Sequence, residues 1–376
     1  MSKKKNSKEN SERQESAFGR RTFMQGVGFA SAAVALGNFK QGSSALAAEP
    51  GNAVKGAPAL ANIESGVLRR SPVVMLWRRV SDLNTASSFV SKTLKQPAVG
   101  KDPTSVMFDA GGALVGYSIR EVAASAQIQQ ACSLETLRDF SLQNNPASLS
   151  VYAPKDFDTS LQGLYEVRGM GPVPAAIAAN DNVAFLDDDG NFSSFSRPSA
   201  YAQGEKVGSK LLSILSNHWP TLRANSPTAN IPNPLIGIDL LVSDVAASKK
   251  FYSEVLGLEA LHTGATEAKF DIGTMILSLK LEPSSRLVSF LNKTGRLLGD
   301  WVVFHVQDIR SATKALERRG VKFPHGIETS VIGDVGYFND PDGHSLVLWQ
   351  PSGKTKMINF TPQLQRILKM AEEAAI

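Results

Sequence analysis

Side chains that bind metals or transfer protons at neutral pH are sparse in this sequence of 376 residues. It contains five histidines and one cysteine, Cys132. Imidazole, thiolate and carboxylate groups are the usual protein ligands of divalent metals, and imidazole is also the most frequent general base. One histidine, His305, lies within an apolar run that is typical of a β-strand. The others lie in predicted turns, connectors or strand edges: His218, His262, His325 and His344.

Asp239 provides a carboxylate in a second apolar run, residues 236–242. Because side chains alternate across a strand, we predict that Asp239 and His305 both face the inside of one curved sheet. Such a pair could act as an acid and a base, or it could be a buried hydrogen-bonded pair that ties two strands together. A metal held by these two residues alone is not expected, because a stable site needs at least a third protein ligand.

The elements that must position these residues repeat four times along the chain. Each unit has a β-like apolar run, a short polar turn, an amphipathic helix, and then short strands that end at a glycine turn. The first runs begin near residues 72, 148, 236 and 301. In the third unit, residues 245, 248, 251, 252 and 255 recur at helical spacing and form one core face. Repetition of this kind predicts a fold built from copies of one supersecondary unit.

Three segments of the chain resemble the vicinal oxygen chelate superfamily, which includes glyoxalase I, extradiol dioxygenases and bleomycin-resistance proteins. They are residues 239–245 (DLLVSDV), 251–258 (FYSEVLGL) and 337–343 (YFNDPDG). The resemblance is strong over residues 236–350 and rests on pattern alone over residues 72–197. It implies an α+β fold in which two βαβββ units build one cup of eight strands. Four units then imply two such modules, with connecting helices.

This architecture divides the chain into successive segments. We expect a signal peptide at 1–47, a flexible spacer at 48–70 and a first, degenerate module at 71–199. A helical linker at 200–233 then leads to a second, glyoxalase-like module at 234–352 and a C-terminal helix at 353–376. The order in which the four units pair with one another stays open.

The metal ligands that the resemblance implies are missing. Enzymatic members carry a His or Glu on the first strand of a unit, seven residues before the turn aspartate, and a Glu on the last strand. The corresponding first-strand residues here are Met75, Leu149, Gly237 and Trp301, and the last-strand residues are Gly116, Ser194, Leu277 and Val347. None of these is of a ligand type, so we expect no metal and no other cofactor.

Aromatic and charged residues with the same strand parity are the candidates for binding a small molecule. An apolar lining with a few polar groups is typical of such a pocket, and equally of a filled core. Arg79 beside Trp77 could hold an anionic aromatic group by charge and stacking, or it could extend to solvent. The candidate ligand-binding residues are Trp77, Arg79, Asp239, Trp301, His305 and Trp349.

The N-terminus resembles a twin-arginine export signal. Arg20 and Arg21 precede Phe23 and a weakly apolar run, and small residues around Ala47 and Ala48 fit a signal-peptidase cleavage site. A short buried helix or a membrane anchor is the alternative, but the run is shorter than the ~20 residues that a span needs. We expect a periplasmic or cell-envelope protein and the twin-arginine machinery as a partner. The thylakoid lumen is the alternative location.

The charge distribution argues against binding to nucleic acid. The formal net charge is +5, and residues 1–47 hold eight Lys and Arg against three Glu, which accounts for all of it. The remaining chain is neutral and lacks the basic footprint of a nucleic-acid-binding protein.

Three functions remain for this sequence. The first is a metal-free protein that binds an apolar or aromatic small molecule. The second is a structural or assembly subunit of an envelope or thylakoid complex. The third is an enzyme, either a lyase, isomerase or dioxygenase with shifted metal ligands, or a metal-free acid–base catalyst.

Replacing Arg20 and Arg21 by Lys should leave the precursor in the cytoplasm. The export machinery recognises the arginine pair itself, so that a variant of equal charge is not expected to be exported. Cell fractionation followed by immunoblotting measures this. Normal export of the double-lysine variant would contradict the twin-arginine assignment.

Overall fold

The computed structural model describes residues 66–119, 148–189, 191–219, 231–281, 301–330, 333–352 and 361–374. The expected signal segment, with Arg20, Arg21, Ala47 and Ala48, lies outside the described residues, as does Cys132. Within the described part of the chain, no helix is both long and apolar enough to cross a membrane.

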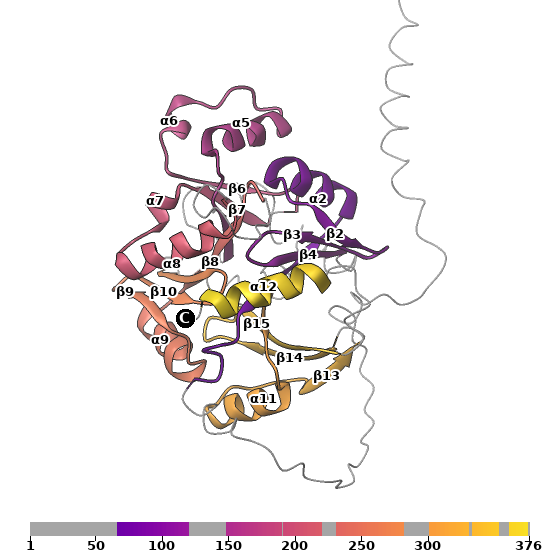
Figure 1. Ribbon diagram of the computed structural model, residues 1–376, viewed down its shortest axis with the longest axis vertical. Helices are drawn as coiled ribbons and strands as arrows, with labels where there is room; N and C mark the ends of the chain where they lie inside the picture. Colours follow the sequence, from indigo (N-terminus) through magenta and orange to yellow (C-terminus); the bar gives the residue numbers. More distant parts are fainter. Residues whose placement is uncertain are drawn as a thin grey trace, which may run out of the picture.

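The first of two sheets, sheet A, has eight strands in the order β13-β14-β15-β12-β1-β4-β3-β2. These strands come from the two ends of the chain (Figure 1). Their bounds are β1 Val73–Val80, β2 Ala98–Lys101, β3 Ser105–Asp109, β4 Leu114–Ile119, β12 Trp301–His305, β13 Ile327–Ser330, β14 Gly333–Asn339 and β15 Ser345–Pro351.

The second sheet, sheet B, has seven strands in the order β6-β7-β5-β8-β11-β10-β9. All of them come from the middle of the chain. Their bounds are β5 Ser148–Tyr152, β6 Asn182–Leu186, β7 Phe192–Ser196, β8 Leu235–Val242, β9 Ala260–Thr263, β10 Glu267–Asp271 and β11 Ile276–Leu281. The two sheets with their helices confirm the predicted α+β class, although sheet B has seven described strands where eight were expected.

The strand pairing determines which units share a cup. In sheet A, β1 of the first unit pairs antiparallel with β12 of the fourth, and Trp77 lies opposite Trp301. In sheet B, β5 of the second unit pairs antiparallel with β8 of the third, and Leu149 lies opposite Asp239. Each sheet therefore combines one unit from the predicted module at 71–199 with one unit from the predicted module at 234–352. Strand alternation specifies which face a side chain takes, but it does not specify the neighbouring strand.

An aspartate begins the main helix of each unit. Asp82, Asp156, Asp244 and Asp308 occupy the N-cap positions, and their carboxylates accept backbone N–H groups of the first turn. This contact satisfies donors that would otherwise have no partner at a helix start. The helices are α2 Leu83–Phe89, α5 Phe157–Val167, α9 Val245–Lys250 and α11 Ile309–Arg318, and α2 and α9 continue as π-helical turns at Val90–Leu94 and Phe251–Val255.

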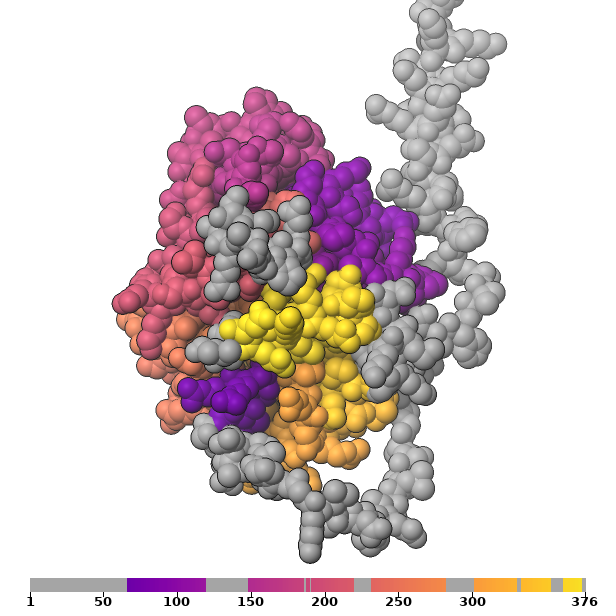
Figure 2. Space-filling model, viewed as in Figure 1, coloured from indigo at the N-terminus to yellow at the C-terminus, as the bar shows by residue number. Residues whose placement is uncertain are grey.

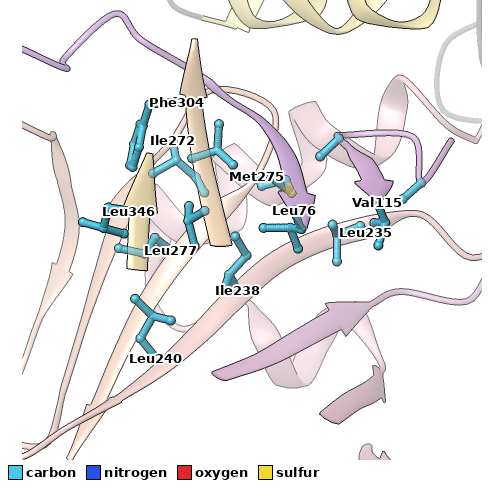
Figure 3. Close-up of a cluster of buried hydrophobic side chains, with 14 of the residues drawn as sticks. Leu76, Val115, Leu235, Ile238, Leu240, Ile272, Met275, Leu277, Phe304 and Leu346 are labelled. Atoms are coloured by element: carbon cyan, nitrogen blue, oxygen red, sulfur yellow. The ribbon is translucent and has the colours of Figure 1, made fainter. Parts of the chain in front are cut away.

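These four helices pack on what we call the outer faces of the sheets. One continuous apolar core joins both outer faces with the helices. Figure 3 shows part of it, where Leu76 of β1 lies near Leu235 and Ile238 of β8. The two sheets therefore share their main core, so each stabilises the other.

Other helices pack on the opposite, inner faces. Helix α12, Thr361–Ala374, covers part of sheet A, where Leu364 and Ile367 are buried in a cluster with Trp77 and Trp349. It is the yellow helix at the surface in Figure 2. Helices α7, Pro198–Tyr201, and α8, Glu205–Ser216, bury their apolar sides against the inner face of sheet B. The expected linker and C-terminal helices are present, and both cover a cup.

Hydrogen bonds join the Asp340–Gly343 turn of the fourth unit, in sheet A, to residues of the third unit. The carboxylate of Asp342 accepts hydrogen bonds from the Ser243 amide at 2.9 Å and the Ser248 hydroxyl at 2.9 Å. Asp340 accepts one from the Tyr252 hydroxyl at 2.9 Å. Both carboxylates are buried, so these bonds form away from water.

Arg78 joins the sheets on the outer side of β1. Its guanidinium donates to the Ser150 hydroxyl of β5 at 2.6 Å, to the Ser193 hydroxyl at 3.2 Å and to the Phe192 carbonyl at 3.0 Å. It is 1% exposed. Burial raises the pKa of the nearby Asp187 carboxyl, and the charge of Arg78 partly offsets this rise.

We expect Arg78→Met to destabilise the protein by about 3–5 kcal/mol at neutral pH, because it leaves a buried carboxylate without its cation. The pKa of Asp187 should then rise further. A carboxyl with a raised folded-state pKa disfavours folding when it is ionised, so the loss should shrink as the pH falls towards 4. Urea unfolding at several pH values measures this. Arg69→Met, at an exposed position, is the control. An equal loss at all pH values would show that Arg78 and Asp187 are not coupled.

Candidate functional site

Five of the six candidate residues meet on the inner face of sheet A. Trp77 and Arg79 lie on β1, Trp301 and His305 on β12, and Trp349 on β15. The three strands are neighbours, with Trp77 opposite Trp301 and His305 beside Trp349. Residues expected in separate modules therefore share one surface, because the first and fourth units form one sheet.

Arg79, Trp301 and Tyr337 form a stack at one end of this face, which we call the Arg79 end. The guanidinium carbon of Arg79 lies 5.1 Å from the centroid of the Trp301 ring. The Trp301 and Tyr337 ring centroids are 5.6 Å apart, with an angle of 70° between the planes. All three residues are half-buried, although the hydroxyl oxygen of Tyr337 is itself buried.

Trp77 fills the space beside this stack. Its indole N–H donates to the Ser118 hydroxyl at 2.9 Å. A Cβ atom at Gly116 would lie 2.2 Å from the Trp77 ring, so only a glycine leaves room for the indole. Gly116 is one of the positions where the family resemblance implies a Glu. An aromatic ring therefore occupies the space beside that position.

Trp349 and the half-buried His305 lie at the other end of the inner face. Trp349 is 1% exposed and belongs to the cluster covered by α12. The His305 ring packs edge-on against it, with centroids 6.4 Å apart. Burial lowers the pKa of His305, which favours its neutral form. Trp349 is therefore packed core, whereas His305 is half-buried, as are the three residues of the Arg79 end.

Asp239 does not meet His305, so the prediction that they face one cup is wrong, and they form neither an acid–base pair nor a hydrogen-bonded pair. Asp239 lies on β8 in sheet B, whereas His305 lies in sheet A. The Asp239 carboxylate is held by Lys280 at 2.6 Å and by the Tyr201 hydroxyl at 3.2 Å. The expectation failed because Asp239 and His305 belong to the third and fourth units, which pair with different partners.

Tyr201 of α7 is buried against the inner face of sheet B. Its hydroxyl lies 3.1 Å from that of Ser278, and a Cβ atom at Gly237 would meet it at 2.1 Å. The buried Lys269 donates to the Tyr201 carbonyl at 3.0 Å. Burial lowers the pKa of Lys269, although nearby Glu267 opposes this shift. These contacts hold α7 in the cup.

One of the positions where the resemblance implies a metal ligand does not lie on an inner face. On the last strand of the third unit, Leu277 faces the outer core, and Ser278 takes the inner position. Ser278 has a hydroxyl in place of the imidazole, carboxylate or thiolate that such a site needs. In the described part of the chain, no group of three or more His, Cys, Asp or Glu is arranged to hold a metal.

Two buried polar atoms near the Arg79 end were not foreseen. Tyr337 Oη and Glu328 Oε2 have no hydrogen-bond partner among the described residues. Burial raises the pKa of Tyr337, and Glu328 adds to this while Arg79 opposes it. Burial also raises the pKa of Glu328. Tyr337 belongs to the segment YFNDPDG, but its ring could be placed only once β14 was known to lie in sheet A.

Comparisons with solved structures find similar folds at low identity. A glyoxalase I variant from Zea mays is 14% identical, with a TM-score of 0.48, over 78% of this chain and 97% of that chain. A glyoxalase/dioxygenase from Nostoc punctiforme is 24% identical, with a TM-score of 0.25, over 31% of this chain and 89% of that chain. No curated protein matches the sequence.

One protein-family profile matches the chain, over less than half of its length. The matched residues run from the start of β8 in the third unit to β15 in the fourth, and they include all three segments on which the resemblance was based. Residues 235–348 of this chain thus match the family described as the Glyoxalase/Bleomycin resistance protein/Dioxygenase superfamily.

Proposed function

We propose that this is a metal-free binding protein that holds an apolar or aromatic small molecule on the inner face of sheet A. The observation that carries the proposal is the convergence of Trp77, Arg79, Trp301 and Tyr337, from both ends of the chain, on one end of that face. Aromatic pairs contribute ~0.5–1.5 kcal/mol beyond the area that they bury. The half-buried Trp301 ring can provide such a contact to a planar ligand.

A structural or assembly role is the second candidate, and a specific observation favours it. The protein's own helices pack on both inner faces, α12 on sheet A and α7 with α8 on sheet B. A cup that is filled by its own chain needs no ligand for stability. The Arg79 end distinguishes the candidates, since a binding protein needs this end to be accessible to a ligand.

The enzyme hypothesis has less support. A metal-dependent lyase, isomerase or dioxygenase needs a set of donors, and the described residues contain no such group. A metal-free mechanism that uses Asp239 as acid and His305 as base is not supported, because the two residues lie in different sheets. These two residues therefore cannot act as acid and base on one substrate.

We also propose that the mature protein works outside the cytoplasm, in the periplasm or cell envelope. The support is the sequence around Arg20 and Arg21, followed by a weakly apolar run and small residues at 45–48. The thylakoid lumen remains the alternative location. The partners in this proposal are the export machinery, the small ligand and, for the structural role, a protein complex.

The purified mature protein should contain no stoichiometric zinc, iron or manganese. The positions implied for ligands lack imidazole, carboxylate and thiolate groups, and several have no donor atom at all, such as Leu149, Gly116 and Val347. Elemental analysis by mass spectrometry measures the content. About one metal ion per chain, lost on His305→Ala or Asp239→Asn, would revive the enzyme hypothesis.

Trp301→Ala should weaken the binding of an aromatic ligand far more than it destabilises the fold, because Trp301 is half-buried. A ligand that binds only the native state stabilises it by ~2.7 kcal/mol at a hundredfold excess over Kd. A thermal-shift screen of aromatic compounds measures this stabilisation in the wild type and in the variant.

Trp349→Ala is the matched control for this experiment. Both tryptophans lie on the inner face of sheet A, but Trp349 is buried, so its loss should cost about 3–5 kcal/mol. If no compound binds the wild type and Trp301→Ala is as destabilising as Trp349→Ala, the Arg79 end is core. The structural role would then replace the binding role.

A further inference from the structure

We infer that the ligand of the Arg79 end is an aromatic carboxylate whose anionic group is held by Arg79 and Tyr337. This inference rests on the proposed binding function and adds the chemical class of the ligand. It depends on the charge and the hydrogen-bonding groups at this end, not on the apolar contacts that support binding in general.

Arg79 supplies the positive charge. Its guanidinium carbon lies over the Trp301 ring at 5.1 Å, a contact that restrains the position of a long side chain. Guanidinium donors lie in one plane, and they match the two oxygens of a carboxylate better than a point charge does. A ligand ring that packs beside Trp301 would bring a carboxylate on that ring towards Arg79.

Tyr337 supplies a hydroxyl donor close enough to Arg79 for the guanidinium charge to act on its pKa. Its ring contacts Trp301, and its Oη is buried without a hydrogen-bond partner among the described residues. A buried polar group without a partner is costly, so a ligand that brings an acceptor gains from satisfying it. Burial raises the pKa of Tyr337, which keeps the hydroxyl protonated and able to donate.

Glu328 limits the negative charge that the site accepts. It lies close enough to raise the pKa of Tyr337, and its own pKa is raised by burial. When it is ionised, its carboxylate repels an anion, so a ligand with a single negative charge fits better than one with two. His305 adds no positive charge at neutral pH, because burial lowers its pKa.

The experiment compares 1-naphthoate with 1-naphthamide, two probes that share one ring system and differ in charge. Binding to the mature wild-type protein is measured by isothermal titration calorimetry at pH 7. We expect the carboxylate to bind at least tenfold more tightly than the amide. Arg79→Met should reduce this preference to less than about twofold, because it removes the charge that distinguishes the two probes. Arg79→Lys should recover only part of it.

Two further variants test the other groups. Tyr337→Phe should weaken naphthoate severalfold and affect naphthamide less, because the phenyl ring keeps the packing on Trp301. Glu328→Gln should strengthen naphthoate binding more than naphthamide binding, so that the preference for the carboxylate increases. Arg69→Met, which removes an exposed cation, is the control and should change neither affinity.

The outcomes separate this inference from the proposed function. If wild type binds both probes equally, or prefers the amide, the carboxylate assignment is overturned and aromatic binding stands. If Arg79→Met keeps the full preference for naphthoate, the anion is held elsewhere and the inference is wrong. If neither probe nor any compound in the aromatic screen binds, the binding function and this inference both fall.

Discussion

The antiparallel pairing of β1 with β12 is the contact on which the rest of the candidate site depends. It places Trp77 opposite Trp301, although these residues lie far apart in the sequence. Without it, Arg79 would have no tryptophan from the fourth unit to pack on, and Tyr337 would lie in a separate sheet. The long loop that this pairing closes costs entropy, and the large core shared by both sheets provides the compensating burial.

Much of the fold could be predicted from residue patterns, and the limits of this prediction have a physical cause. The aspartates 82, 156, 244 and 308 mark helix starts because an N-cap is a local interaction. Alternation assigned Met75, Trp77 and Trp349 to an inner face, but it misplaced Leu277 by one position. Alternation could not identify which strands are neighbours in a sheet, because the same alternating pattern fits any order of the strands. For this reason Asp239 and His305 were paired wrongly, whereas Arg79 and Trp301 were assigned to different cups.

Aromatic side chains fill the inner faces at two positions where the family resemblance implies metal ligands. At Gly116 and Gly237, the missing side chains leave space that the Trp77 ring and the Tyr201 hydroxyl occupy. Tyr201 comes from a segment that was expected only to connect two modules. Its contacts with Asp239 and Ser278 join residues distant in sequence, so no local pattern could have revealed them. Aromatic packing and hydrogen bonds thus stabilise these two positions. A polar metal ligand buried there without a partner would be costly.

The division of the chain between the two sheets has a consequence for the order of folding. Sheet B uses only residues 148–281, so its strands are all available before the fourth unit has been synthesised. Sheet A needs β1 from near the start of the described chain and β12–β15 from near its end. Its closure, and the docking of α12, therefore wait for an almost complete polypeptide. Until β12 has been synthesised, the edge of β1 that pairs with it has no partner strand. An unpaired strand edge of this kind is prone to misassembly.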